Sequence, residues 1–193
     1  MEAAARNCII VHGCPHYSPA ETDPETRTYD KNWIPRTKAQ LEARGIRTET
    51  PLMPTPWKPD YAEYKKVFER YVIDESSILV GHSCGCAFLA RWLGDTKRHV
   101  FRLVFVAPWK IPDKGDEIRK TFYDFPIDET IRARIGDVVM FTADNEADDG
   151  KRSLEIYHKA LGGKILELKG RGHYISEHMK TDEFPELIDA IMG

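Results

Sequence analysis

The chain has 193 residues, with 28 Lys and Arg against 31 Asp and Glu, so its formal net charge is −3. This near balance gives no support for binding to nucleic acid or to an acidic membrane surface. No apolar run reaches the roughly 18 residues of a membrane-spanning helix, and the first residues lack the layout of a signal peptide. With 41% hydrophobic residues, we expect a single globular domain over residues 1–193 and a cytoplasmic location.

Short apolar runs alternate along the chain with longer amphipathic stretches. Near-continuous apolar runs of this kind are typical of strands buried on both faces. We predict strands at residues 7–12, 46–50, 77–82, 101–107, 138–142 and 164–168, and helices at residues 33–43, 61–72, 84–93, 153–161 and 184–192. This alternation predicts an α/β fold, with a mostly parallel sheet of about six strands and helices on both faces. Ligand sites in such folds lie at the carboxyl ends of the strands.

The most specific motif is a G-x-S-x-G sequence that runs from Gly81 to Gly85 and is centred on Ser83. It follows a predicted strand and precedes a predicted helix, where a sharp turn leaves no room for flanking side chains. Such a turn exposes the serine hydroxyl at a helix N-terminus, whose N–H groups stabilise negative charge. We therefore predict Ser83 as a nucleophile; the alternative is a serine that only caps the helix.

A serine nucleophile needs a base and an acid that orients the base. His173 lies just after the last predicted strand and is preceded by Gly172, which is the place of the base in hydrolases with the chain order Ser, acid, His. The segment after the strand at residues 138–142 carries several carboxylates, among them Asp144, Glu146 and Asp148. Spacing alone does not choose among them.

The first predicted strand ends in the sequence H-G-C-P at residues 12–15. A loop here supplies one N–H of an oxyanion hole, and the residue after the nucleophile supplies the other. We predict Cys84 and Cys14 as these donors, with Gly13 as the alternative to Cys14, because the proline that follows has no N–H. The cysteines are otherwise interpreted as buried thiols in a reducing compartment. A bond from Cys14 to Cys84 or Cys86 stays open.

Together these motifs resemble the small α/β-hydrolases of the retinoblastoma-binding-protein-nine and YdeN-like family, over most of the chain. The resemblance rests on the H-G loop, the G-x-S-x-G turn, the acidic loop and the Gly172-His173 pair. It implies a three-layer α/β-hydrolase fold with a minimal lid, and serine-hydrolase activity on esters or similar acyl compounds. The family's acidic loop usually reads S-D-N-D and its last residue is the acid. Residues 143–146 read A-D-N-E, which ranks Glu146 first, Asp144 second and Asp148 third.

Few residues lie outside the predicted sheet and its helices, and the stretch 108–131 is the candidate for a small cover. We predict substrate contacts from Trp109, Tyr174 and His82; the alternative for each aromatic side chain is packing beneath a loop. Four histidines could lie near the predicted site: His12, His16, His82 and His173. They have neither H-x-H nor H-E-x-x-H spacing. We therefore expect no catalytic metal and no cofactor.

We expect a carboxylesterase-like serine hydrolase that cleaves small ester or other activated acyl substrates through an acyl-enzyme on Ser83. One alternative is a catalytically weak pseudo-hydrolase that acts as a protein-binding module, which the altered acidic loop motivates. A thiol enzyme that uses Cys84 or Cys14 is disfavoured, because a side chain one residue beyond the apex of the turn points away from the exposed position. The expected partner is a small acyl substrate, with neither nucleic acid nor membrane, and the oligomeric state is not predicted.

Overall fold

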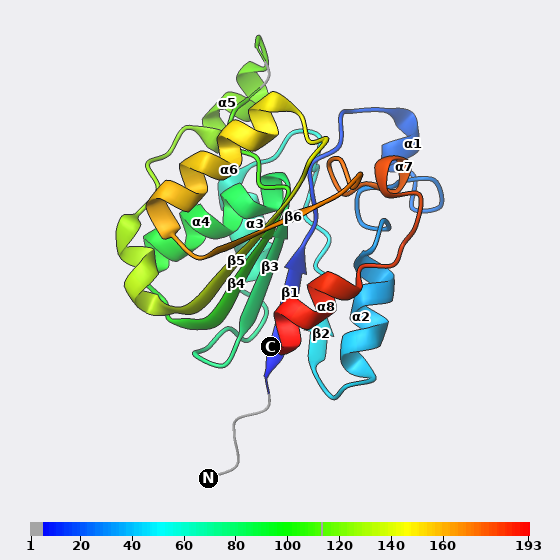
Figure 1. The fold of residues 1–193 in the computed structure, drawn as a ribbon. Helices are drawn as coiled ribbons and strands as arrows, with labels where there is room; N and C mark the ends of the chain where they lie inside the picture. The colour runs from blue at the N-terminus through cyan, green and yellow to red at the C-terminus, as the bar shows by residue number, and fades with distance from the viewer. Residues whose placement is uncertain (1–5, 113) are drawn as a thin grey trace.

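The computed structural model describes residues 6–112 and 114–193 and contains one six-stranded sheet (Figure 1). Its strands are β1 (Asn7–Val11), β2 (Arg47–Glu49), β3 (Ile78–His82), β4 (Val100–Val106), β5 (Ile135–Ala143) and β6 (Lys164–Leu168). They lie in the order β2-β1-β3-β4-β5-β6, and every neighbouring pair is parallel. The predicted parallel sheet is confirmed. The strand order reverses between β1 and β3, and ligands bind at such a point in open α/β sheets.

Helices cover both faces of the sheet, which makes a three-layer fold (Figure 1). One face carries α3 (Tyr61–Phe68), α4 (Cys84–Thr96), α5 (Glu117–Tyr123) and α6 (Asp148–Leu161). The other face carries α2 (Ile34–Glu42) and α8 (Pro185–Met192). Three short elements lie in the connections: α1 (Pro19–Thr22), the 3-10 helix η1 (Glu129–Arg134) and α7 (Ser176–Met179). Among the described residues, no helix is long and apolar enough to cross a membrane.

Side chains along each central strand alternate between two hydrophobic cores. In β3, Leu79 packs in the core beneath α3, α4 and α6, whereas Ile78 and Val80 pack in the core beneath α2 and α8. The same alternation in β4 sends Phe105 to the first core and Val104 to the second. Because both faces are covered, most positions of these strands are apolar, as in the runs 78–80 and 103–106, and this is the pattern that the sequence shows.

Several predicted helix boundaries are wrong, for identifiable reasons. Helix α6 begins at Asp148 rather than at residue 153, and its two aspartates occupy the first turn, where the helix dipole favours negative charge. Helix α4 continues through Gly94 and ends when Lys97 adopts a left-handed conformation with φ 55°. Helix α3 ends at Phe68, and Val72, which its spacing places on the buried face, is 65% exposed.

The candidate cover at residues 108–131 contains a helix that the sequence pattern did not predict. Helix α5 begins after Asp116, whose side chain accepts a hydrogen bond from the backbone N–H of Arg119 at 3.0 Å. Phe122 and Tyr123 anchor it in the core against α4. Its seven residues leave too short a pattern for helical periodicity to stand out.

Candidate active site

Ser83 lies on the sharp turn between β3 and α4, with φ 53° and ψ −119°. A Cβ atom on Gly81 would lie 2.8 Å from the backbone nitrogen of Cys86, and one on Gly85 would lie 2.5 Å from the carbonyl oxygen of Val11. Both glycines are therefore required by close backbone contacts. The Ser83 N–H donates to the carbonyl of Val106 at 3.0 Å, which ties the turn to β4 and holds a backbone conformation that only a surrounding structure sustains.

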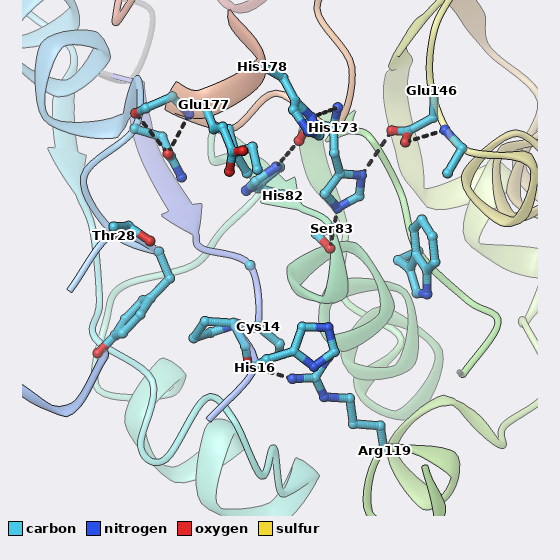
Figure 2. A pocket seen from close by; sticks show the side chains of 18 of the residues that line it. Cys14, His16, Thr28, His82, Ser83, Arg119, Glu146, His173, Glu177 and His178 are labelled. Carbon is cyan, nitrogen blue, oxygen red and sulfur yellow. Dashed lines mark hydrogen bonds and ion pairs between the residues drawn. The ribbon is translucent and has the colours of Figure 1, made fainter. Parts of the chain in front are cut away.

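A chain of hydrogen bonds links the serine to a histidine and a carboxylate (Figure 2). His173 Nε2 lies 2.8 Å from Ser83 Oγ, and His173 Nδ1 lies 2.9 Å from Glu146 Oε2. Glu146 is only 6% exposed, and its second oxygen accepts the backbone N–H of Ala147 at 2.8 Å. A carboxylate only accepts, so it fixes the proton of the neutral imidazole on Nδ1 and leaves Nε2 as the acceptor facing the serine hydroxyl.

The structure places the three candidate acids in different roles. Only Glu146 of the three has a hydrogen bond to His173. Asp144 accepts the backbone N–H of Gly170 at 2.7 Å, and Asp148 occupies the first turn of α6. Gly150 lies beneath Glu146, because a Cβ atom there would lie 2.8 Å from the carboxyl carbon of Glu146. The glycine lets α6 approach the carboxylate closely.

The loop that carries His173 is held by hydrogen bonds on several sides. The His173 N–H donates to His178 Nδ1 at 2.9 Å, and its carbonyl accepts from His82 Nε2 at 2.9 Å. The N–H of Gly172 donates to the side-chain oxygen of Asn145 at 2.8 Å. Sequence reasoning missed Asn145 and His178, because both act on backbone groups and neither belongs to a spaced motif.

Of the predicted substrate contacts, Trp109 and His82 line the cavity and Tyr174 does not. The Trp109 ring meets the His173 ring edge-on, with centroids 5.2 Å apart. Tyr174 is fully buried; its ring stacks on Phe184 and its hydroxyl donates to the Thr142 carbonyl at 2.6 Å. The prediction for Tyr174 is therefore wrong: its ring packs beneath the loop.

His82 is 2% exposed and acts chiefly as a support for the loop of the base. Burial lowers its pKa to about 3, so the ring is neutral near pH 7. Because Nε2 carries the proton that bonds the His173 carbonyl, Nδ1 is an acceptor. This Nδ1 is buried and has no hydrogen-bond partner among the described residues. The ring therefore contributes more to the position of His173 than to contact with a ligand.

The loop after β1 is fixed by the buried side chain of His12. Its Nδ1 donates to the Gly13 carbonyl at 2.7 Å, and its Nε2 accepts the Met53 N–H at 2.9 Å. Burial lowers the pKa of His12 to about 4, so this neutral arrangement persists near pH 7. In a trans peptide the C=O and N–H bonds point in opposite directions. The N–H of Cys14, which shares the peptide with the Gly13 carbonyl, therefore points away from His12.

Cys14 and Cys84 are joined by a disulfide, with their Cα atoms 5.7 Å apart. The interpretation of free buried thiols is wrong for this pair; it holds for Cys8 and Cys86, which are free and buried. Cys84 is the first residue of α4, where backbone N–H groups have no carbonyl one turn earlier to bond. The disulfide thus links the loop after β1 to the first residue of α4, directly after Ser83.

A cavity of about 620 Å³ surrounds the serine hydroxyl. Arg119 and His16 lie at one end of it, and Glu177 and His178 of α7 lie at the other, with Ser83 between them (Figure 2). Within residues 6–112 and 114–193, no group of three or more His, Cys, Asp or Glu side chains is arranged to hold a metal ion. Ser83, Glu146 and His173 all line this cavity.

Comparison with solved structures identifies the fold. The chain is similar to the ydeN gene product of B. subtilis, with a TM-score of 0.79 and 16% identity over 98% of this chain and 97% of that one. It is similar to a putative YdeN-like hydrolase of Pectobacterium atrosepticum, with a TM-score of 0.65 and 12% identity over 96% and 89% of the two chains. Est1E of Butyrivibrio proteoclasticus, with ferulic acid bound, gives a TM-score of 0.65 and 13% identity over 97% and 88%.

These likenesses show the α/β-hydrolase fold. No curated protein matches the chain significantly in sequence. The model of the Serine hydrolase family, however, matches residues 26–191, which include Ser83, Glu146 and His173. The chain therefore belongs to the serine hydrolase family of α/β-hydrolase enzymes.

Proposed function

We propose that this enzyme is a carboxylesterase-like hydrolase of small esters, with Ser83, His173 and Glu146 as its catalytic triad. The observation that carries the proposal is the unbroken hydrogen-bond chain from Ser83 Oγ through His173 to Glu146. The fold is shared with Est1E, which has been solved with ferulic acid bound, and with the carboxylesterase CesB of Bacillus subtilis. Both likenesses agree with an ester substrate.

In the first half of the reaction, Ser83 Oγ attacks the ester carbonyl carbon while His173 Nε2 takes the hydroxyl proton. Glu146 stabilises the imidazolium that forms and keeps the ring oriented. The tetrahedral intermediate collapses when the bond to the alkoxy oxygen breaks. The departing alcohol takes the proton from Nε2, and an acyl-enzyme remains on Ser83.

In the second half, a water molecule attacks the acyl carbon and gives a proton to His173 Nε2. The bond to Ser83 Oγ breaks, Oγ recovers that proton, and the carboxylic acid leaves. We assign the backbone N–H groups of Cys84 and Cys14 to the oxyanion hole in both halves. The helix start supports the first assignment, and the peptide held by His12 supports the second. Preorganised donors of this kind contribute strongly, because they need not reorganise during the reaction.

Labelling with a fluorophosphonate probe tests the proposal directly. We expect the wild-type protein to be labelled at Ser83, as located by peptide mass mapping, and to hydrolyse short-chain esters. The Ser83→Ala variant should keep the circular dichroism spectrum and lose both properties. A folded wild-type protein that is not labelled would contradict the triad and would favour the pseudo-hydrolase that binds another protein.

The remaining sequence-based predictions concern the domain organisation and the cellular location of the protein. We propose one domain over residues 1–193, because the single sheet draws strands from residue 7 to residue 168 and α8 closes it at residues 185–192. The cytoplasmic location stays a prediction, and the Cys14–Cys84 disulfide weighs against it, since disulfides persist chiefly in oxidising compartments.

A further inference from the structure

The end of the cavity opposite His173 carries a buried positive charge. Arg119 projects from α5, is 8% exposed, and lines the cavity beside His16 (Figure 2). Its Nε lies 3.4 Å from Asp116 Oδ2, and one terminal nitrogen donates to the Pro15 carbonyl. A guanidinium has five N–H donors in a planar fork. The two contacts involve Nε and one of the two terminal nitrogens.

The distribution of acidic groups makes this end of the cavity the favourable place for an anion. Among the residues that the structure describes, two acidic residues line the cavity, Glu146 and Glu177. Glu146 is bonded to His173, and Glu177 lies on α7 at the opposite end from Arg119 (Figure 2). Asp116 neutralises Arg119 in part, but its carboxylate also caps α5 and does not line the cavity. An anion placed at this end would therefore meet the guanidinium away from both described carboxylates of the cavity wall.

The direction of the reaction indicates which part of a substrate reaches Arg119. The leaving alcohol takes its proton from His173 Nε2, so the alcohol part must lie on the His173 side of Ser83. The acyl part then extends away from His173. Arg119 and His16 lie on that side (Figure 2). A carboxylate accepts two parallel N–H bonds from a guanidinium, a geometry that a lysine cannot offer.

We propose that Arg119 is a specificity-determining residue that selects esters with a carboxylate on the acyl chain, such as half-esters of short dicarboxylic acids. The proposal rests on the ester hydrolysis proposed above. Hydrolysis of such a half-ester gives the dicarboxylate and the alcohol, and the charged group takes no part in bond making or breaking. Its effect should therefore appear in substrate binding and orientation.

The test compares esters that differ only in this charge. Monoethyl succinate, glutarate and adipate are paired with the ethyl esters of the corresponding monoamides, in which a neutral amide replaces the carboxylate. We expect wild-type kcat/KM to favour the carboxylate over its amide by about 10- to 100-fold for the chain length that reaches Arg119. The Arg119→Met variant should lose this preference, so that the ratio of kcat/KM between the carboxylate ester and the amide ester falls to about 1. Arg119→Lys should retain part of it.

Lys120→Met is the matched control. Lys120 follows Arg119 on α5, and its side chain is 58% exposed, pairs with Glu117 at 3.5 Å and does not line the cavity. This variant removes the same charge from the same helix and should keep the wild-type preference. Thermal unfolding of each variant shows whether the protein still folds, since Arg119 also holds the Pro15 carbonyl.

The proposal is overturned if the wild type shows no carboxylate preference. It is also overturned if the preference persists in Arg119→Met, which includes an equal loss of activity on both esters. A preference only for acetate esters whose alcohol part carries the carboxylate overturns it as well. Binding of monoethyl glutarate to Ser83→Ala, measured by calorimetry with and without Arg119→Met, gives a second readout that needs no turnover. If the wild type hydrolyses no ester but this binding still depends on Arg119, the proposed function fails and the anion site stands.

Discussion

Cys14, on the loop after β1, and Cys84, at the first position of α4, are joined by a disulfide that closes a sequence separation of 70 residues. The same two residues carry the N–H groups that we assign to the oxyanion hole. The bond therefore fixes the distance between the loop and the serine turn through a covalent link. The Gly13–Cys14 peptide is held independently by His12. The disulfide and the hydrogen bond from His12 thus both hold the peptide that carries the Cys14 N–H.

Removal of the disulfide should lower both stability and activity. A loop of this length predicts a loss of about 4 kcal/mol in the free energy of unfolding, measured by urea denaturation of the Cys14→Ser, Cys84→Ser double variant. We expect kcat to fall roughly 10-fold or more, because single oxyanion donors contribute about 100- to 1000-fold. Dithiothreitol should reproduce both effects in the wild type and have none on the double variant. An unchanged kcat after full reduction, verified by thiol titration, would show that the bond does not organise the site.

Glu146→Gln should abolish most of the activity while leaving the fold intact. The amide can present its N–H₂ group to His173 Nδ1 and then favours the wrong tautomer, so we expect kcat to fall about 100- to 10,000-fold. Asp148→Asn is the control, because Asp148 lies in the first turn of α6 and should change kcat little. Steady-state ester hydrolysis measures both. Equal losses in the two variants would contradict the assignment of Glu146 as the acid.

Gly150→Ala should separate activity from stability. Alanine favours a helix over glycine by about 1 kcal/mol, yet its Cβ would lie 2.8 Å from both the carboxyl carbon and Cγ of Glu146. The clash should displace the carboxylate from His173 and lower kcat at least several-fold. The midpoint of thermal unfolding should change less than it does when a buried apolar side chain is truncated. Wild-type kcat in this variant would mean that Glu146 shifts without losing its bond to His173.

The stability of the protein should fall as the pH drops below about 6.5. Burial lowers the pKa of His82 to about 3 and of His12 to about 4, so the unfolded chain binds more protons than the folded protein between these values and the ordinary pKa of 6.5. The contribution of these two histidines to the free energy of unfolding is therefore complete above pH 6.5 and is lost as the pH falls toward 4. The loss is about 2 kcal/mol for each histidine by pH 5.

Urea denaturation at pH 7.5 and pH 5 measures this dependence. His82→Gln should reduce the difference between the two pH values, although it removes the bond to the His173 carbonyl. His99→Gln, at an exposed position, should leave the difference unchanged. If His82→Gln shows the full wild-type dependence, burial of His82 does not govern acid sensitivity.

Much of the fold is readable from the sequence, because local patterns determine it. The runs 78–80 and 103–106 are apolar at every position, which is typical of strands covered on both faces. Helix ends are less readable. Asp148 and Asp149 look like loop residues in a sequence, yet the dipole of a helix that already packs on β5 makes them favourable in its first turn.

The conformation of the turn at Ser83 is also readable from the sequence, since two glycines around a serine between a strand and a helix leave few other conformations. The sequence could not decide which carboxylate faces His173, because Asp144, Glu146 and Asp148 lie within one short segment. Only the closure of α6 over β5, with Gly150 beneath Glu146, points one of them at the imidazole. The roles of Arg119 and His178, and the link from Cys14 to Cys84, likewise depend on segments distant in the chain. The reason is physical: backbone conformation follows from near neighbours, whereas the partner of a side chain follows from the packing of the whole chain.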